Sequence, residues 1–449
     1  MAMIMVCRRG RQDTNWSFVM TFSSITKAEH SERGIAVAPV RREQKAARTG
    51  YQEGFEEGRR LGLAVGQRGY GIHFEGTSII IPTFNRLQVL KKCLDNIFEH
   101  TASSHEIIVV DNGSNDGTSS YLKSLAGAVR SRKLDKNRGY AGAVNVGLTM
   151  AKGTTIALLH EDTMVTHKWL DNMLRCLNSN PQIGMVGPVT DRTAKEMQEI
   201  EHRNNRQNSK RWRKTDRLPG CCLLFRRELF EQIGFFDEGF ENGSCEDEDY
   251  FLRVRLLGRH LMTAGDTFVH YNGFGGVREP NERLLEKWNS MLEWMESAGI
   301  HSITPQRTTA HTAVFYPERI LVRALGPTVY WIENGERHPV RGTVSVPAVR
   351  VSQVDLRRWP LGKPVEYEKP ELEFRGLTES GSRLLGVVRL PDGNHYHVEG
   401  GKVRRIVNRS AMEAWNLHLK PVREISTERL MSRESGLPII APPVLRQML

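Results

Sequence analysis

Residues 106–118, Glu-Ile-Ile-Val-Val-Asp-Asn-Gly-Ser-Asn-Asp-Gly-Thr, decide the fold of this chain. An unbroken apolar run at 107–110 ends abruptly at Asp111 and a small polar turn. Such runs are typical of strands that are buried on both faces of a parallel sheet. Ligands of open α/β sheets bind beyond the carboxyl ends of the strands, so Asp111 is placed to meet one. The alternative interpretation is an aspartate that caps the next helix.

Two more strands with polar ends lie near this one in the sequence. The run 77–81 leads into Pro82-Thr83-Phe84-Asn85-Arg86, and the run 155–159 leads into His160-Glu161-Asp162. Strand-like and helix-like segments alternate from 77 to about 275, which predicts an α/β fold with a mainly parallel, Rossmann-like sheet. We expect the three strands to be neighbours and their polar ends to share one edge of that sheet.

Apolar spacing predicts the elements between and after these strands. The expected helices are 87–97, one beginning after 116–118, 141–150, 167–178 and 282–296, and a further strand is expected at 184–186. The polar and basic segment 195–217 is expected to be an exposed loop or helix, placed over the site.

Length and composition limit the class of protein. The chain has 449 residues, 39% hydrophobic and 26% charged, which indicates a globular protein of two to three domains. Its net charge of +11 favours anionic partners without choosing among them. The six cysteines lack a CxxC pair, and no apolar run reaches the length of a membrane helix. We therefore expect a cytoplasmic protein with reduced thiols, with peripheral attachment to a membrane as an alternative.

The two ends of the chain differ in style from its middle. In the N-terminal extension, 1–75, five glycines from Gly50 to Gly66 recur every fourth residue, which predicts either a helix with a glycine stripe or a flexible linker. After a helix and linker at 280–309, residues 310–410 are expected to form a small all-β domain with two related hairpins, around Asn334-Gly335 and Gly400-Gly401. For this β domain we expect a role in docking the molecule on which the α/β domain acts, or in homo-oligomer formation. Residues 411–449 are expected to be an irregular tail.

Further motifs follow the three strand ends in a fixed order. They are Asn137-Arg138-Gly139-Tyr140-Ala141-Gly142 with Asn145, 220–227, Gly234-Phe235-Phe236-Asp237-Glu238, Glu246-Asp247-Glu248-Asp249 and His270. Together with the strand ends, this set resembles the inverting family 2 glycosyltransferases of the GT-A fold. The resemblance covers 77–275, within an expected domain at 76–279. It implies an enzyme of glycan biosynthesis that moves a sugar from a nucleoside diphosphate sugar to an acceptor hydroxyl on a glycan, a lipid-linked carrier or a protein.

The resemblance also implies roles for individual residues. The donor would be bound by Pro82, Thr83, Asn85, Asp111, Asn137, Arg138, Gly139, Gly142 and Glu161. A divalent cation, Mg²⁺ or Mn²⁺, would be held by Asp162 and His270, since hard oxygen ligands suit such ions and a diphosphate leaving group needs charge neutralisation. Asp247 would be the general base and Glu246 would support the acceptor. His160 and Glu161 depart from the family's usual residues, which puts direct metal contacts from either of them in doubt.

Three other classes of protein compete with this one. A nucleotidyltransferase also places acids at strand ends, but the sequence has no GxxxxGK phosphate loop. A non-catalytic carbohydrate- or partner-binding protein on a decayed transferase scaffold would explain His160 and Glu161, although Asp162, Asp247 and His270 are retained. Nucleic-acid binding is not expected, because the basic residues are dispersed and form no recognition motif.

Overall fold

The computed structural model describes residues 73–190, 212–240, 245–271, 282–297, 311–368, 371 and 386–446. All of them fall in the unit that runs from Ile72 to Leu449. The glycine-rich segment at 50–66, the linker at 302–309 and most of the polar segment 195–217 lie outside the described residues.

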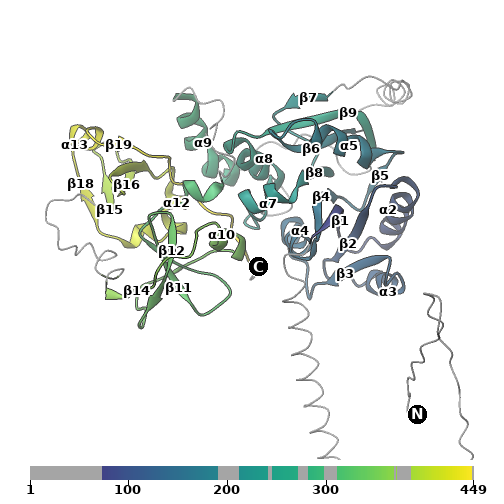
Figure 1. Cartoon of the computed structure of the whole chain (residues 1–449), viewed down its shortest axis with the longest axis horizontal. Coiled ribbons are helices and arrows are strands. Elements are labelled where there is room, and N and C mark those ends of the chain that lie inside the picture. Colours follow the sequence, from purple (N-terminus) through teal and green to yellow (C-terminus); the bar gives the residue numbers. More distant parts are fainter. Residues whose placement is uncertain are drawn as a thin grey trace, which may run out of the picture. The chain divides into compact units, whose positions relative to one another are not determined.

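A nine-stranded mixed sheet forms the centre of the first part of this unit (Figure 1). Its strands are β1 (Phe74–Thr83), β2 (His105–Asp111), β3 (Val129–Lys133), β4 (Gly153–Leu159), β5 (Thr163–Val165), β6 (Ile183–Thr190), β7 (Trp212–Thr215), β8 (Cys222–Arg226) and β9 (His260–Tyr271). Their order is β3-β2-β1-β4-β8-β6-β9-β5, and β7 pairs with β9. β1 lies between β2 and β4 and is parallel to both, which confirms the three neighbouring strands predicted from the sequence.

Helices cover both faces of this sheet. They are α2 (Leu87–His100), α3 (Thr118–Ser124), α4 (Gly139–Met150), α5 (Trp169–Asn178), α7 (Arg227–Ile233) and α8 (Glu246–Leu256). Side chains alternate along β1, so Ile79 and Ile81 pack with residues of α2 and α5, whereas Ile80 packs with residues of α4, α7 and α8. The predicted α/β fold class is therefore confirmed.

The end of the polar segment is a strand, not the loop or helix expected from the sequence. β7 pairs antiparallel with β9, with Trp212 opposite Ala264. The Trp212 indole packs against the core on the α2 and α5 face, and its Nε1 donates to Asp266 Oδ1 at 3.1 Å. Backbone pairing and one anchored tryptophan thus hold a strand whose remaining residues are polar.

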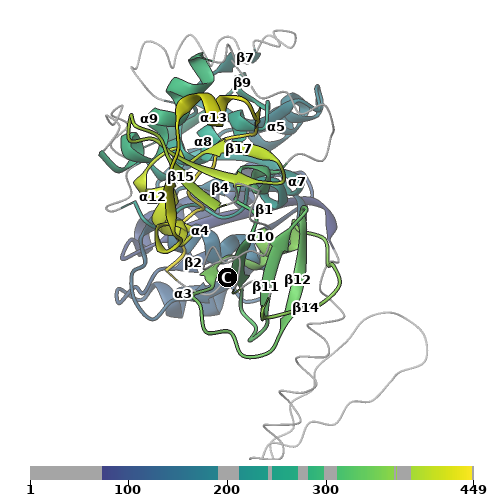
Figure 2. The same cartoon turned by 90° about the vertical axis from the view of Figure 1, so that its left-hand side faces the viewer.

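Two five-stranded sheets make up the C-terminal part of the unit, and Figure 2 shows them as separate sheets. The first contains β10 (Ile320–Arg323), β11 (Val329–Glu333), β12 (Glu336–Arg341), β13 (Val349–Arg350) and β14 (Val365–Glu366). The second contains β15 (Gly386–Arg389), β16 (His395–Glu399), β17 (Lys402–Arg405), β18 (Val422–Glu424) and β19 (Glu434–Ser435). Their strand orders, β13-β10-β11-β12-β14 and β18-β15-β16-β17-β19, are equivalent position by position. In both, the three central strands are antiparallel and the outer two pair in parallel.

The equivalence of the two sheets extends beyond the predicted hairpins. Both hairpin turns have two consecutive residues at positive φ, Asn334-Gly335 and Gly400-Gly401, as the type I′ turn requires. Helix α10 (Gln353–Arg357) follows Ser352 and helix α13 (Thr427–Met431) follows Ser426, and each serine hydroxyl accepts from a backbone N–H three residues on. The chain therefore contains a duplicated unit, which we call repeat 1 (residues 311–368) and repeat 2 (residues 386–446).

The expectation of an irregular tail at 411–449 is wrong. This segment supplies β18, α13 and β19 to repeat 2, together with the end of α12 (Arg409–Ala414) and the short helix η3 (Leu417–Leu419). The strands are only two or three residues long and are held by edge pairing, so they leave no apolar period in the sequence.

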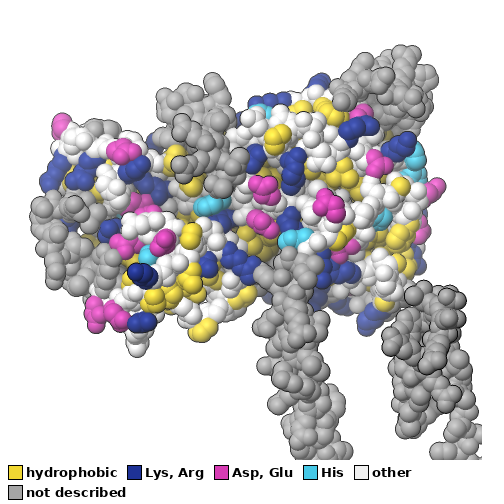
Figure 3. Space-filling view, viewed as in Figure 1, with side chains coloured by type: hydrophobic (Ala, Val, Ile, Leu, Met, Phe, Trp, Pro, Cys, Tyr) yellow, Lys and Arg dark blue, Asp and Glu magenta, His cyan; other side chains and the backbone are white. Residues whose placement is uncertain are grey.

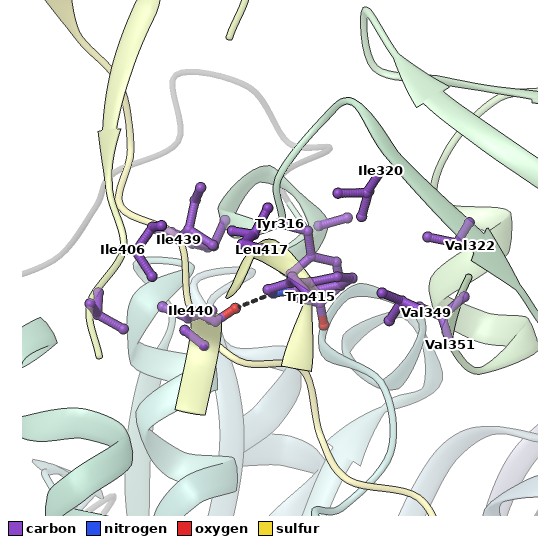
Figure 4. Packing of buried hydrophobic residues seen from close by; sticks show 14 of the residues in the cluster. Tyr316, Ile320, Val322, Val349, Val351, Ile406, Trp415, Leu417, Ile439 and Ile440 are labelled. Atoms are coloured by element: carbon purple, nitrogen blue, oxygen red, sulfur yellow. Dashed lines mark hydrogen bonds between the residues drawn. The ribbon is translucent and has the colours of Figure 1, made fainter. Parts of the chain in front are cut away.

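One apolar core joins the repeats to α9 (Glu282–Ser297) and to the end of α8. Figure 4 shows Trp415 of repeat 2 at its centre, beside Tyr316 of repeat 1, whose ring centroid lies 4.7 Å from that of Trp415. The Trp415 Nε1 donates to the carbonyl of Ile440 at 2.7 Å.

A buried ionic group adds a polar connection between the repeats. The Glu399 carboxylate lies 2.7 Å from His397 Nδ1 and 2.5 Å from Arg404 Nη1, and it accepts from the backbone N–H of Glu318 at 2.7 Å. Burial acts to raise the pKa of Glu399, but the charges and hydrogen bonds of His397 and Arg404 outweigh it and lower this pKa to about 2. Glu399 is therefore ionised at neutral pH and connects its two partners in repeat 2 to the backbone of repeat 1.

Three expectations from composition concern membrane helices, cysteine pairing and the distribution of charge. Among these residues no helix is both long enough and apolar enough to cross a bilayer. The five cysteines in the described ranges are buried and are not paired in disulfides with one another. On the face drawn in Figure 3, lysine and arginine side chains are interspersed with acidic ones.

Candidate functional site

Asp111, the acid that ends the apolar run at 107–110, is the last residue of β2 and is completely buried. Its Oδ1 accepts from the backbone N–H of Ser114 at 2.8 Å. The next helix, α3, starts after Gly117 without a side-chain cap, so the helix-cap interpretation of Asp111 is wrong. The Asp111 Oδ2 is also buried, and it has no hydrogen-bond partner among the described residues.

The end of β1 lies beside the end of β2, with Thr83 opposite Asp111. Asn85 is in the left-handed region, with φ of 52°, and its backbone N–H donates to Ser114 Oγ at 2.9 Å. Its side-chain oxygen accepts from Asn115 N at 2.9 Å, so the two loops are bound to each other. Pro82 is buried, and the buried Thr83 Oγ1 has no partner within the described part of the chain.

The loop before α4, which is expected to bind the donor, is held by a residue that the sequence did not single out. Asn112 Nδ2 donates to Asn137 Oδ1 at 2.9 Å and to the Gly139 carbonyl at 3.0 Å, while its Oδ1 accepts from Arg138 N at 2.9 Å. Gly139 needs its glycine for a φ of 75°. At Gly142 a Cβ would lie only 2.9 Å from Arg138 Cβ, so this glycine allows close packing. Asn112 directly follows Asp111, but its partners 25 to 27 residues away are invisible in the sequence.

Arg86, from the loop after β1, contacts Glu161 and Asp162, which follow the end of β4. Arg86 Nη1 lies 2.7 Å from Asp162 Oδ2 and 3.9 Å from Glu161 Oε1. Burial, and to a smaller extent the charge of Asp162, raises the pKa of Glu161 to about 7, against the opposing charge of Arg86. The other oxygen of Asp162, Oδ1, is buried and has no hydrogen-bond partner among the described residues.

His160 and His270 occupy different surroundings. The His160 ring packs between Tyr140, at a centroid distance of 4.6 Å, and Tyr271, at 5.8 Å. His270, on β9, lies edge-on to Phe268 at 4.8 Å. In the described ranges no group of three or more histidine, cysteine or acidic residues could hold a metal ion, so the expected pair of Asp162 and His270 is not part of such a group.

Glu246 and Asp247 open helix α8, and Asp247 is placed against Gly220. A Cβ built on Gly220 would lie 1.8 Å from Asp247 Oδ2, so the carboxylate occupies space that only glycine leaves open. The carbonyl of the next residue, Cys221, accepts from the backbone N–H of His160 at 2.9 Å. The turn at 220–221 thereby connects the end of β4 to the acids of α8.

The first turn of α8 is anchored by one of its own residues, Asp249, which is completely buried. Its carboxylate lies 2.7 Å from Arg253 Nη2 and 2.6 Å from Lys287 Nζ, and it accepts from Trp288 Nε1 at 2.9 Å. Burial acts to raise the pKa of Asp249, but the charges of Arg253 and Lys287 prevail and lower it to about 2. Asp249 thus anchors α8 and orients Glu246 and Asp247.

Part of this chain is similar to known proteins. Residues 78–234 match the family "Glycosyl transferase family 2". Glycosyltransferase AglE of Haloferax volcanii is 26% identical over 198 residues, 42% of this chain and 64% of AglE. Chondroitin synthase of Escherichia coli is 23% identical over 47% of this chain and 37% of its own length. This chain therefore spans less than two thirds of either relative.

A solved structure gives a weaker likeness. The mannosyltransferase PcManGT of Pyrobaculum calidifontis, in complex with GDP-Man and Mn²⁺, is 21% identical over 52% of this chain and 66% of its own, with a TM-score of 0.37. The sequence match spans β1, β2 and β4 and their polar ends, together with the loop before α4. The match supports a family 2 glycosyltransferase domain over residues 78–234, the part of the chain that holds these strand ends and this loop.

Proposed function

We propose that this protein transfers a sugar from a nucleoside diphosphate sugar to an acceptor hydroxyl, with inversion at the anomeric carbon. The observation that carries the proposal is a row of buried polar atoms at the carboxyl ends of β1, β2 and β4. Thr83 Oγ1, Asp111 Oδ2 and Asp162 Oδ1 are all buried and lack hydrogen-bond partners among the described residues. A buried acceptor without a partner costs about 1–3 kcal/mol, so a ligand that supplies donors there is bound favourably.

Donor binding is assigned to the ends of β1 and β2 and to the loop before α4. Asp111 and Thr83 would meet the base or ribose, because a buried carboxylate forms strong hydrogen bonds with N–H and hydroxyl donors. The backbone of the loop at 137–142, held by Asn112, would lie along the diphosphate, where helix α4 begins.

The residues at the end of β4 fit a Mg²⁺ or Mn²⁺ ion that arrives with the donor. Mg²⁺ is commonly bound by one or two carboxylates together with substrate phosphates, and the Asp162 Oδ1 offers one hard oxygen ligand. Such an ion would neutralise the charge that develops on the leaving diphosphate. Arg86 would release Asp162 Oδ2 as the ion binds, and His270 is proposed as a further ligand.

In the transfer itself, the acceptor oxygen would bond to the anomeric carbon as the bond from that carbon to the diphosphate breaks on the opposite face. The acceptor proton would pass to the Asp247 carboxylate. Glu246 would contact the acceptor. Asp249 and its partners hold α8, so they would keep Asp247 in place during the reaction.

The test is transfer and donor hydrolysis across a panel of UDP-, GDP- and dTDP-sugars, with Mn²⁺ and with chelator. Asp247→Asn should lower kcat by about 10²- to 10⁴-fold. Glu248→Gln is the matched control, because Glu248 is the neighbouring acid on the same turn and its carboxylate pairs with Arg217. If no donor is turned over, while sugar binding is retained and unaffected by Asp247→Asn, the protein is a binding protein on a transferase scaffold and the proposal is wrong.

A further inference from the structure

Tyr140 stands where the three parts of the site converge. It is the second residue of α4, directly after the loop that we assign to the donor. Its ring lies over His160, at the end of β4, with a centroid distance of 4.6 Å and a tilt of 39°. Tyr140 thus touches both the donor loop and the segment that carries Asp162.

Acidic residues from two further elements influence the phenol of Tyr140. Burial raises the pKa of this phenol well above 10, and the charges of Asp247, Glu246 and Glu161 raise it further. These three carboxylates come from the start of α8 and the end of β4. The ring contact with His160 and the buried oxygen place the phenol beside the end of β4, within the influence of these carboxylates.

This hydroxyl is buried, and among the described residues it has no hydrogen-bond partner. The phenol stays protonated at neutral pH, so it offers one O–H donor to whatever enters the site. A buried hydroxyl without a partner is unfavourable by about 1–3 kcal/mol, and packing of the ring alone would be served equally well by phenylalanine. Unlike the Tyr250 hydroxyl, which lies in the apolar core, the Tyr140 hydroxyl lies beside the site residues, where a ligand would supply its partner.

The position of Tyr140 selects which part of the ligand it meets. The nucleoside is assigned to Asp111 and Thr83, and the acceptor proton is assigned to Asp247. In an in-line transfer the sugar lies between these two groups. We infer that the Tyr140 hydroxyl donates a hydrogen bond to a hydroxyl oxygen of the transferred sugar, which makes Tyr140 a residue that positions and selects the sugar. This inference rests on the proposed function.

The test compares Tyr140→Phe with the wild-type protein in binding two kinds of probe by titration calorimetry. The probes are UDP-glucose, UDP-N-acetylglucosamine, GDP-mannose and dTDP-rhamnose, each paired with its own nucleoside diphosphate. Loss of the hydrogen bond should raise the Kd of the sugar donor about three- to tenfold and leave the Kd of the nucleoside diphosphate unchanged. A donor that lacks the contacted sugar hydroxyl should bind both proteins equally.

Tyr250→Phe is the matched control. Tyr250 also has a buried hydroxyl without a partner in the described ranges, but its ring stacks on Phe236 at 3.9 Å in the apolar core. Loss of the Tyr250 hydroxyl should change neither the Kd of the sugar donor nor that of the nucleoside diphosphate. In Tyr140→Phe the aromatic ring is retained, and with it the contact with His160, so the melting temperature should be unchanged. A lower melting temperature would reveal a folding defect.

Two results would overturn the inference. Equal changes in Kd for donor and nucleoside diphosphate would place the hydroxyl on the nucleotide, and an unchanged donor Kd with a lower kcat and a shifted pH profile would place it on Asp247. If wild-type protein binds none of the sugar donors, the proposed function fails instead. If wild-type protein binds the sugar donors, and Tyr140→Phe discriminates between donor and nucleoside diphosphate as well as wild type does, only the inference about Tyr140 fails.

Discussion

The contact between Gly220 and Asp247 gives the sharpest prediction. In Gly220→Ala the new methyl carbon would lie 1.8 Å from Asp247 Oδ2 and 2.8 Å from its Cγ. Real Cβ contacts are no shorter than 3.0 Å, so the carboxylate must move by at least about 1.2 Å. A misplacement of about 1 Å can cost roughly 10²-fold, and a general base contributes about 10²- to 10⁴-fold, so we expect kcat to fall about 100-fold.

The assay is steady-state transfer with the donor and acceptor found by the panel, together with thermal unfolding. Gly220 is not at positive φ, so alanine strains no backbone there and the melting temperature should be nearly unchanged. Gly326→Ala is the control, because a Cβ at that position would meet no atom of the described residues within 4 Å and activity should be normal. Gly220→Ala should add little to Asp247→Asn, since both act through one carboxylate. A stable Gly220→Ala protein with wild-type kcat would refute the assignment of Asp247 as the base.

Three more outcomes are expected. Arg86→Gln frees Asp162 from a half-exposed ion pair, so Mn²⁺ should bind the nucleotide-free protein about two- to fivefold more tightly in calorimetry; weaker binding would contradict the competition. Asp111→Asn keeps an acceptor for Ser114 but loses the carboxylate charge, so donor KM should rise about 10- to 100-fold with kcat little changed; a selective loss of kcat would contradict a donor role. Glu399, with its pKa lowered to about 2, stabilises the fold above pH 4.5, and roughly 3 kcal/mol of stability should vanish as the pH falls from 4.5 to 2. In urea unfolding, Glu399→Gln should have a lower free energy of unfolding than wild type at pH 7, and this free energy should not fall between pH 4.5 and pH 2 as it does in wild type. The same pH dependence in both proteins would argue against the buried ionic group.

The sequence predicted those features that leave a periodic or apolar pattern. The runs that became β1, β2 and β4, with their order and polar ends, were predictable because buried parallel strands are continuously apolar. β7 and β19 were not, because pairing with a neighbouring strand forms them and their own residues are mostly polar.

The candidate site was predictable to a similar depth. Strand ends identified Asp111 and Asp162, but the contacts that complete the site run between distant loops. Asn112 binds the loop at 137–139, and Gly220 makes room for Asp247, which lies 27 residues further along the chain. Neither relation has a local signature, since each depends on how the chain returns to the same edge of the sheet.

The contact of Trp415 with Tyr316 makes the two copies of the duplicated unit depend on each other. Arrays of stacked repeats lengthen easily when each copy presents the same face to the next. Here a segment between β17 and β18, longer than its counterpart between β12 and β13, folds back from the second copy onto the start of the first. The two copies thus share one core and are not joined end to end alone. A substitution at Trp415 or Tyr316 would therefore affect the stability of both copies at once.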